Sequence, residues 1–182
     1  MKIGIIGGGA SGLVAAITSA KNSANVTLIE KKDRVGKKIL ATGNGKCNFT
    51  NHSMNKFDFR SQNSAIFDDY ISQFDKNAVI SMFQDMGMLT KDRNGYLYPR
   101  SEQASTLLDL LRLQLKELNI PVLTEYYPIS IQKKKNSKGN FQYYVSYELP
   151  KYIDGKRRKT TKTFPVGTTL AEVKQFRAEK DL

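Results

Sequence analysis

Residues 2–12 are Lys2-Ile3-Gly4-Ile5-Ile6-Gly7-Gly8-Gly9-Ala10-Ser11-Gly12, and this stretch decides the fold. Its β-branched first half predicts a strand over residues 2–6, and the small apolar residues from Ala10 to Ala20 predict a helix. A second apolar run, from Val26 to Glu30, predicts a strand that ends in an acid. The order of strand, glycine turn, helix and strand is that of a dinucleotide-binding βαβ unit. We therefore expect an α/β fold of the Rossmann-like type.

Three glycines form the pattern G-x-G-x-x-G between this strand and this helix, which is the context that the pattern requires. Gly7 would allow the tight turn, Gly9 the approach of a pyrophosphate, and Gly12 the close packing of helix on sheet. The first amides of the helix and its positive dipole end suit phosphates. The alternative is a glycine-rich turn that only packs a helix on a sheet. The following strand and its acid favour dinucleotide binding.

Glu30 lies at the end of the second strand, 18 residues after Gly12. A carboxylate at this place accepts hydrogen bonds from the adenosine ribose hydroxyls and repels the 2′-phosphate of NADP. These residues alone leave FAD and NAD open as cofactors.

Residues 34–51 are rich in Gly, Asn, Thr and Lys and show no apolar periodicity. This composition predicts a long ordered loop with at most one helical turn. Loops of that length in a compact domain are usually functional. Backbone amides and Asn side chains in such a loop suit hydrogen bonding to a planar heterocycle such as a flavin.

Residues 33–51 resemble the second signature of the bacterial aminoacetone oxidase-like FAD-dependent oxidoreductases, a branch of the glutathione-reductase-type flavoproteins. The resemblance rests on Thr42-Gly-Asn-Gly-Lys-Cys-Asn48 together with the glycine turn, and it continues through Gly95-Tyr-Leu-Tyr-Pro-Arg-Ser-Glu-Gln-Ala104. It covers roughly residues 1–130. It implies a Rossmann-like FAD-binding domain and an oxidoreductase that passes electrons between the flavin and a small organic substrate or an electron carrier.

The resemblance also implies two groups of cofactor-binding residues. The pyrophosphate would bind at Gly7, Gly9, Ala10, Ser11 and Gly12, and the ribose at Glu30. The pyrophosphate, the ribityl chain or the flavin ring would be approached by Lys31, Lys38, Thr42, Gly43, Asn44, Gly45, Lys46, Cys47, Asn48 and Thr50. Redox chemistry would belong to the flavin, so the sequence names no catalytic acid or base.

Four residues of this region have simpler interpretations beside the functional ones. A redox-active disulfide needs a second cysteine, and Cys47 is the only one in the chain, so packing or cofactor contact is favoured over a nucleophile. A solvated surface charge and a cofactor contact explain Lys38 equally well. For Lys37, a solvated surface charge is the better explanation. His52, the only histidine, indicates a surface loop residue, and no metal site is expected.

Further elements are predicted up to residue 124. Asp75 can cap a helix that Gly87 ends, and the stripe of Met82, Met86 and Met88 is typical of core filling. Asn94-Gly95 predicts a tight turn between strands over 88–90 and 96–98. A leucine-rich helix is predicted over 101–118 and a strand over 120–124.

The character of the sequence changes after residue 128. Residues 131–182 contain 13 basic and five acidic residues and so carry +8 of the formal net charge of +12. We therefore expect an FAD-binding domain at 1–128, incomplete relative to its family, and a small basic β-rich segment at 129–182. Strands are predicted over 141–148 and 160–164, joined by an Asp154-Gly155 turn, and Thr169 with Glu172 predicts a capped helix over 170–179.

This segment resembles, more weakly, the small N-terminal arm-binding domain of phage-type tyrosine recombinases. The residues that carry the resemblance are Tyr143-Tyr-Val-Ser-Tyr147, the basic turn over 154–159, the strand over 160–164 and the predicted helix. It implies contact with DNA, in which Lys and Arg would neutralise phosphates. A solubilising hairpin and helix explains the same residues equally well. The later glycine-rich motifs of the flavoprotein family do not occur, so the sequence also predicts a truncated or fused flavoprotein.

Three functions remain open from the sequence. The first is an FAD-dependent oxidoreductase, the second a vestigial flavoprotein whose basic segment binds DNA, and the third an inactive fragment. A cytoplasmic location without membrane contact is expected, because the sequence shows neither a signal-peptide pattern nor a run of about 18 apolar residues. The substrate, the electron donor and the oligomeric state are not predicted.

Overall fold

The computed structural model describes residues 2–54, 64–135, 137, 139, 141–153 and 156–164. The chain divides into two compact units. One combines Met1–Gly36 with Leu115–Leu182, and the other is Lys37–Gln114. Each unit is described by itself. The boundary predicted near residue 128 stays a prediction.

The first unit contains the predicted βαβ motif. Strand β1 is Lys2–Ile6, helix α1 is Ala10–Lys21, and strand β2 is Asn25–Ile29. Strand β6, Val122–Leu123, adds to β2, so the parallel sheet has the order β1-β2-β6. The bounds of β1, α1 and β2 agree with the sequence prediction to within one residue, and the α/β Rossmann-like fold class is confirmed.

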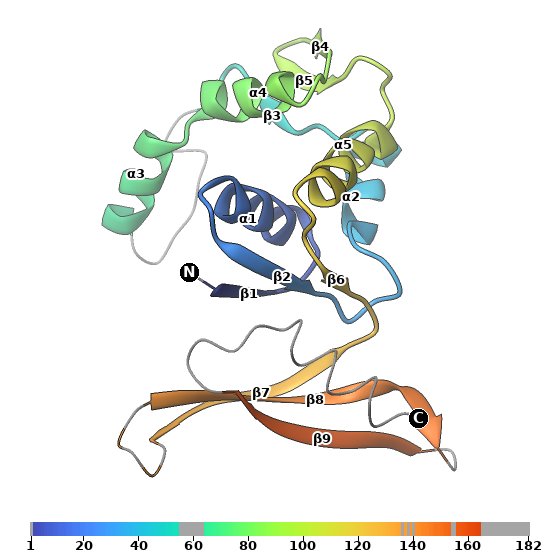
Figure 1. Cartoon of the computed structure of the whole chain (residues 1–182). Coiled ribbons are helices and arrows are strands. Elements are labelled where there is room, and N and C mark those ends of the chain that lie inside the picture. The colour runs from blue at the N-terminus through green and yellow to red at the C-terminus, as the bar shows by residue number, and fades with distance from the viewer. Residues whose placement is uncertain are drawn as a thin grey trace. The chain divides into compact units, whose positions relative to one another are not determined.

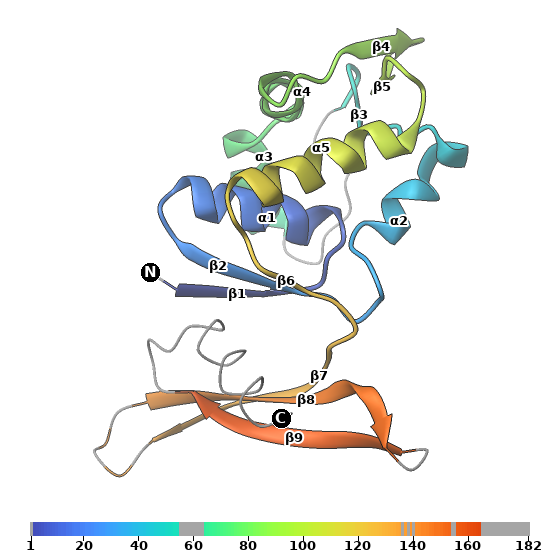
Figure 2. The same cartoon turned by 45° about the vertical axis from the view of Figure 1, so that its right-hand side comes forward.

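Helix α1 covers one side of β1 and β2 (Figures 1 and 2). Its buried residues Leu13, Ala16 and Ile17 recur at helical spacing and face the sheet. Leu28 of β2 is completely buried, and Val26 is 3% exposed. This small core holds the turn between β1 and α1 in place.

A second sheet of this unit follows β6. Strand β7 is Tyr127–Lys135, β8 is Phe141–Ile153 and β9 is Lys156–Phe164, all antiparallel with β8 in the middle. The two strands predicted here are confirmed, and both are longer than predicted. The Asp154-Gly155 turn and the helix predicted over 170–179 lie outside the described residues.

The second unit combines helices with a small antiparallel sheet. Its sheet has the order β3-β5-β4. In chain order the elements are α2 Lys37–Leu40, the 3₁₀ helix η1 Thr42–Gly45, β3 Thr50–Asn51, α3 Ser64–Gln73, α4 Lys76–Asp85, β4 Thr90–Arg93, β5 Tyr96–Pro99 and α5 Ala104–Glu117, whose last three residues belong to the first unit.

The helix cap and the tight turn predicted in the second unit are confirmed, whereas the strand predicted over 88–90 lies at Thr90–Arg93. Asp75 caps α4 by accepting hydrogen bonds from the backbone amides of Asn77 and Ala78, both at 2.9 Å. Asn94 and Gly95 both have positive φ, 54° and 87°, as the tight turn between β4 and β5 requires. The structure adds α3, which the sequence analysis did not predict.

Glu102 ties this hairpin to the segment that leads into α5. Its carboxylate pairs with Arg93 and with Lys91, whose Nζ lies 3.4 Å from Oε1. Desolvation alone would raise the pKa of Glu102, but the hydrogen bond from Lys91 and the charges of Arg93 and Lys91 outweigh it, so the pKa is lowered.

Within the described part of the chain, no helix is long and apolar enough to cross a bilayer.

Candidate functional site

The turn between β1 and α1 needs glycine at two of the predicted positions. Gly7 has φ +103°, a left-handed value that L side chains rarely adopt, and its amide donates to the Ile29 carbonyl at 2.7 Å. A Cβ at Gly12 would lie 1.8 Å from the Gly7 carbonyl oxygen. The first glycine therefore shapes the turn, and Gly12 lets α1 pack against it.

Gly8 is a functional residue that the sequence analysis missed. A Cβ there would lie 2.5 Å from Cγ1 of Val35 and 3.0 Å from Oε2 of Glu30. Its amide donates to Glu30 Oε2 at 2.6 Å, and its carbonyl accepts from the Gly36 amide at 2.7 Å. The middle glycine is thus enclosed by the segment that follows β2. The G-x-G-x-x-G pattern leaves this position free, so only contacts with later residues show that glycine is needed.

Gly9 differs from Gly8 and Gly12, because a Cβ built on it meets no atom within 4 Å. It is also the N-cap of α1 and provides no side-chain cap. The first amides of α1 lack intrahelical acceptors, and Ala10 and Ser11 beside it are exposed. Open space, free donors and the positive end of a helix dipole fit the pyrophosphate of a dinucleotide.

Glu30 lies directly after β2 and is 9% exposed. Besides the Gly8 amide on Oε2, the Lys32 amide donates to Oε1 at 2.8 Å. Its own amide donates to the Leu123 carbonyl at 2.7 Å, and its carbonyl accepts from Tyr126 at 3.2 Å. An ionised carboxylate offers about four lone-pair sites, so each oxygen keeps acceptor capacity for a ribose hydroxyl. The predicted ribose contact stays a prediction, and the structure adds a second role, holding the glycine turn.

In the second unit, the loop from Thr42 to Cys47 has an unusual backbone. Gly43, Asn44, Gly45 and Cys47 all have positive φ, at 53°, 56°, 82° and 57°. The loop is closed by the amides of Lys46 and Cys47, which donate to the carbonyls of Gly43 at 3.0 Å and Thr42 at 3.2 Å. Residues other than glycine that adopt left-handed backbone angles are concentrated at ligand sites, where the surrounding structure stabilises that conformation. The compact loop presents exposed backbone, as the predicted flavin contact requires.

Two residues that follow this loop are buried. Cys47 is a free thiol with 6% exposure, which agrees with the packing interpretation, while its contact with a cofactor stays a prediction. Thr50, in β3, is 7% exposed, and its buried hydroxyl has no hydrogen-bond partner in the structure as described. An unpaired buried hydroxyl costs about 1–3 kcal/mol. A ligand group at Thr50 would remove that cost, so this residue also fits the cofactor.

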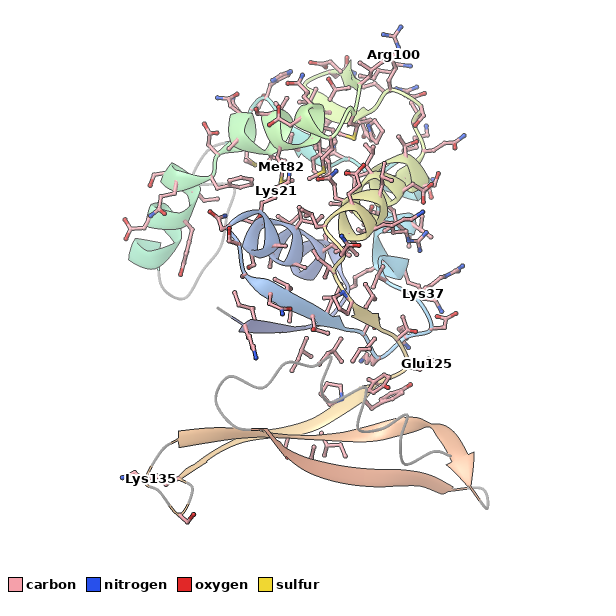
Figure 3. The ribbon with its side chains drawn as sticks, in the orientation of Figure 1. Lys21, Lys37, Met82, Arg100, Glu125 and Lys135 are labelled. Atoms are coloured by element: carbon pink, nitrogen blue, oxygen red, sulfur yellow. The ribbon has the colours of Figure 1, made fainter. Side chains whose placement is uncertain are left out.

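The predicted lysines lie on the surface. Lys31, Lys38 and Lys46 are exposed, and Lys37 points outward from α2 (Figure 3). His52 is half-exposed and pairs with Asp92 at 3.0 Å, as expected of a surface loop residue. The structure therefore brings Gly7, Gly9, Gly12 and Glu30 together in the first unit. In the second unit, it brings together the predicted residues from Thr42 to Asn48 and Thr50.

Comparisons with known proteins agree with this fold. The chain matches the family model described as HI0933-like protein Rossmann domain over residues 1–149. This match includes β7 and most of β8, whereas the resemblance recognised in the sequence covers only roughly residues 1–130.

Relatives and solved structures match the same part of the molecule. A 3-dehydro-bile acid delta(4,6)-reductase of Clostridium scindens is 43% identical over 125 residues, 68% of this chain and 31% of that protein. A ribosomal RNA dihydrouridine synthase of Haemophilus influenzae is 27% identical over 74% of this chain and 33% of that protein. The chain thus spans about a third of the length of the curated relatives it matches.

Two solved structures share the fold. Thermovibrio ammonificans THI4 has a TM-score of 0.50 at 17% identity, covering 80% of this chain and 46% of that one. The open conformation of a flavocytochrome c3 fumarate reductase has a TM-score of 0.52 at 15% identity, covering 79% and 30%.

The resemblance to the aminoacetone oxidase-like flavoproteins and the assignment of FAD as cofactor are confirmed at the level of the family. The recombinase resemblance of the C-terminal segment stays a prediction. The glycine turn with open space beside the helix N-terminus and the acid at the end of β2 agree with the family match over most of the chain. This chain therefore belongs to the HI0933-like protein Rossmann domain family of FAD-binding flavoproteins.

Proposed function

We propose that this chain is the FAD-binding part of an oxidoreductase that passes electrons through bound flavin to or from a small organic substrate. The observation that carries the proposal is the open space at Gly9 beside the uncapped N-terminus of α1. Bound FAD would supply the electron-transfer chemistry. The chain would hold its pyrophosphate with the amides of α1 and its adenosine ribose with Glu30.

The loop from Thr42 to Thr50 is proposed to contact the ribityl chain or the flavin ring. Support comes from the family resemblance and, within the second unit, from the exposed backbone of the loop and the unpaired Thr50 hydroxyl. The reductase from Clostridium scindens supports a small organic substrate, because its name gives a bile acid derivative. A cytoplasmic location is proposed with this function.

The first test is retention of FAD. The purified chain is reconstituted with FAD, desalted and scanned for the flavin absorbance bands. Gly9→Glu should abolish retention, because its carboxylate would occupy the space proposed for the pyrophosphate and repel it. Gly4→Glu is the matched control, since a Cβ at Gly4 also meets no atom within 4 Å. Equal flavin in both variants, or none in the folded wild-type chain, would contradict the proposal.

Nucleic-acid binding by the basic segment is the second candidate function. Strand β9 supports it, since Lys156, Arg157, Arg158, Lys159 and Lys162 fall within nine residues that contain no acid. A relative named ribosomal RNA dihydrouridine synthase also supports nucleic acid as a partner. Contact with DNA, as the recombinase resemblance implies, is the form of this proposal to test first.

Binding of a duplex DNA is measured as a function of salt. Arg157→Glu combined with Arg158→Glu should weaken binding and reduce the slope of log affinity against log salt by about 2, because each lost phosphate contact removes nearly one unit. The double variant Lys21→Glu, Lys116→Glu makes the same charge change at exposed helix positions and should leave the slope unchanged. An RNA of equal length is measured in parallel. Identical slopes for both double variants would exclude β9 as the contact.

A further inference from the structure

Strand β5 lies beside the chain that leaves the loop from Thr42 to Cys47. It pairs with β3 in the small sheet of the second unit (Figure 2). Thr50 is the register partner of Leu97, and the Phe49 amide donates to the Leu97 carbonyl at 3.1 Å. A side chain of β5 can therefore reach the loop that is proposed to contact the flavin.

Tyr98 is the residue of β5 that does so. Atom Cε1 of its ring would lie 3.9 Å from a Cβ at Gly43, which is ordinary van der Waals contact. Its neighbours Leu97 and Pro99 are buried, whereas Tyr98 is half-buried. Side chains alternate along a strand, so Tyr98 points to the face opposite these two core residues. Packing of the core therefore does not account for a tyrosine at this position.

Two hydrogen-bonding groups near Gly43 have no partner among the described residues. One is the hydroxyl of Tyr98, and the other is the backbone amide of Asn48, whose nitrogen would lie 3.0 Å from a Cβ at Gly43. Both groups can donate, and both residues are partly exposed. Gly43 is itself exposed and has no side chain to cover them. This side of the loop therefore offers two donors to a ligand that carries acceptor atoms.

We propose that Tyr98 is a further residue of the flavin site, whose hydroxyl hydrogen-bonds the flavin ring beside the Asn48 amide. The oxygens and nitrogens of the ring are acceptors that suit these donors, and such hydrogen bonds tune the electronics of the cofactor. Gly43 is small because a side chain there would stand between the ring and the two donors. The proposal rests on the proposed FAD-binding function and adds a contact to the flavin half of the cofactor.

The test compares the binding of FAD with that of ADP, which lacks the flavin half. Tyr98→Phe keeps the aromatic ring and removes only the hydroxyl. It should raise the dissociation constant of FAD about three- to tenfold, the value of one ordinary hydrogen bond, and leave that of ADP unchanged. The hydroxyl has no described partner in the FAD-free chain, so the urea midpoint of that chain should also stay unchanged. Tyr96→Phe is the matched control, because Tyr96 lies on the same face of β5 and is 54% exposed.

Flavin fluorescence gives an independent readout. Tyrosine and tryptophan quench an excited flavin by transferring an electron to it, whereas phenylalanine does not. The chain contains no tryptophan, so tyrosine is its only side chain of this kind. FAD bound to Tyr98→Phe should therefore fluoresce more strongly than FAD bound to the wild-type chain or to Tyr96→Phe.

The outcomes separate this contact from the proposed function. The proposal is refuted if Tyr98→Phe and the wild-type chain bind FAD equally well and with equal fluorescence. It is also refuted if Tyr98→Phe weakens ADP and FAD binding to the same extent or lowers the urea midpoint of the FAD-free chain, because the hydroxyl would then serve the fold. FAD binding that Gly9→Glu abolishes and Tyr98→Phe leaves unchanged would keep the proposed function and remove only the contact. A folded wild-type chain that binds no FAD would overturn both.

Discussion

Gly12→Ala is expected to remove FAD retention and a large part of the stability of the chain. Its Cβ would lie 1.8 Å from the Gly7 carbonyl oxygen, far inside van der Waals contact, and the obstructing atom belongs to the backbone. Helix α1 would have to move away from the turn. Overpacking of this kind costs on the order of 3 kcal/mol, against a total stability of about 5–15 kcal/mol for a typical domain.

The measurement is a urea unfolding curve of the FAD-free chain together with the flavin absorbance after desalting. Gly4→Ala is the matched control, because its methyl group meets no atom within 4 Å and its backbone is that of an ordinary strand. It should unfold at the same urea concentration as the wild-type chain or at a slightly higher one. If Gly12→Ala and Gly4→Ala unfold at the same midpoint, the close approach of α1 to Gly7 is not a property of the chain in solution.

Glu30→Gln is expected to weaken FAD binding and also to destabilise the chain without FAD. The two oxygens of the carboxylate accept from the amides of Gly8 and Lys32. An amide side chain has one oxygen, so its NH₂ group would face one of these donors. A buried donor without an acceptor costs about 1–3 kcal/mol, and the ribose would lose a charged acceptor as well.

Two readouts separate these effects. The urea midpoint of the FAD-free chain measures how much the hydrogen bonds of Glu30 to the glycine turn stabilise the fold. The FAD dissociation constant measures the contribution of the ribose contact. Glu125→Gln makes the same charge change at an exposed position of the same unit and should alter neither (Figure 3). A Glu30→Gln chain that binds FAD weakly but unfolds like the wild type would mean that the carboxylate serves the ribose alone.

The first strands and helix could be predicted because their signals are local. The β-branched run, the glycine pattern and the small apolar residues specify β1, the turn and α1 without reference to distant residues. The Asn94-Gly95 turn is predictable for the same reason, since both residue types tolerate positive φ. Helix α3 has apolar residues at helical spacing, Ile66, Phe67, Tyr70 and Ile71, and that signal would have found it.

Other features depend on contacts that no local pattern contains. Gly8 must be glycine because Val35 and Glu30 enclose it, and both belong to a later segment. The positive φ of Cys47 is not favoured by its residue type and follows from the closed Thr42–Cys47 loop. The family match also reaches residue 149, further along the chain than the change of composition near residue 128 indicates, because a run of basic residues in β7 does not by itself end a domain.

The hydrogen bonds at Glu30 also set an order of events during synthesis. The fingerprint residues leave the ribosome first, but Glu30 is bonded through its backbone to Leu123 and Tyr126. At about 5–20 residues per second, the roughly 90 residues between them take several seconds to translate. Until then the end of β2 lacks the strand that pairs with its outer edge, so the nucleotide site of the nascent chain is completed only after β6 has been translated.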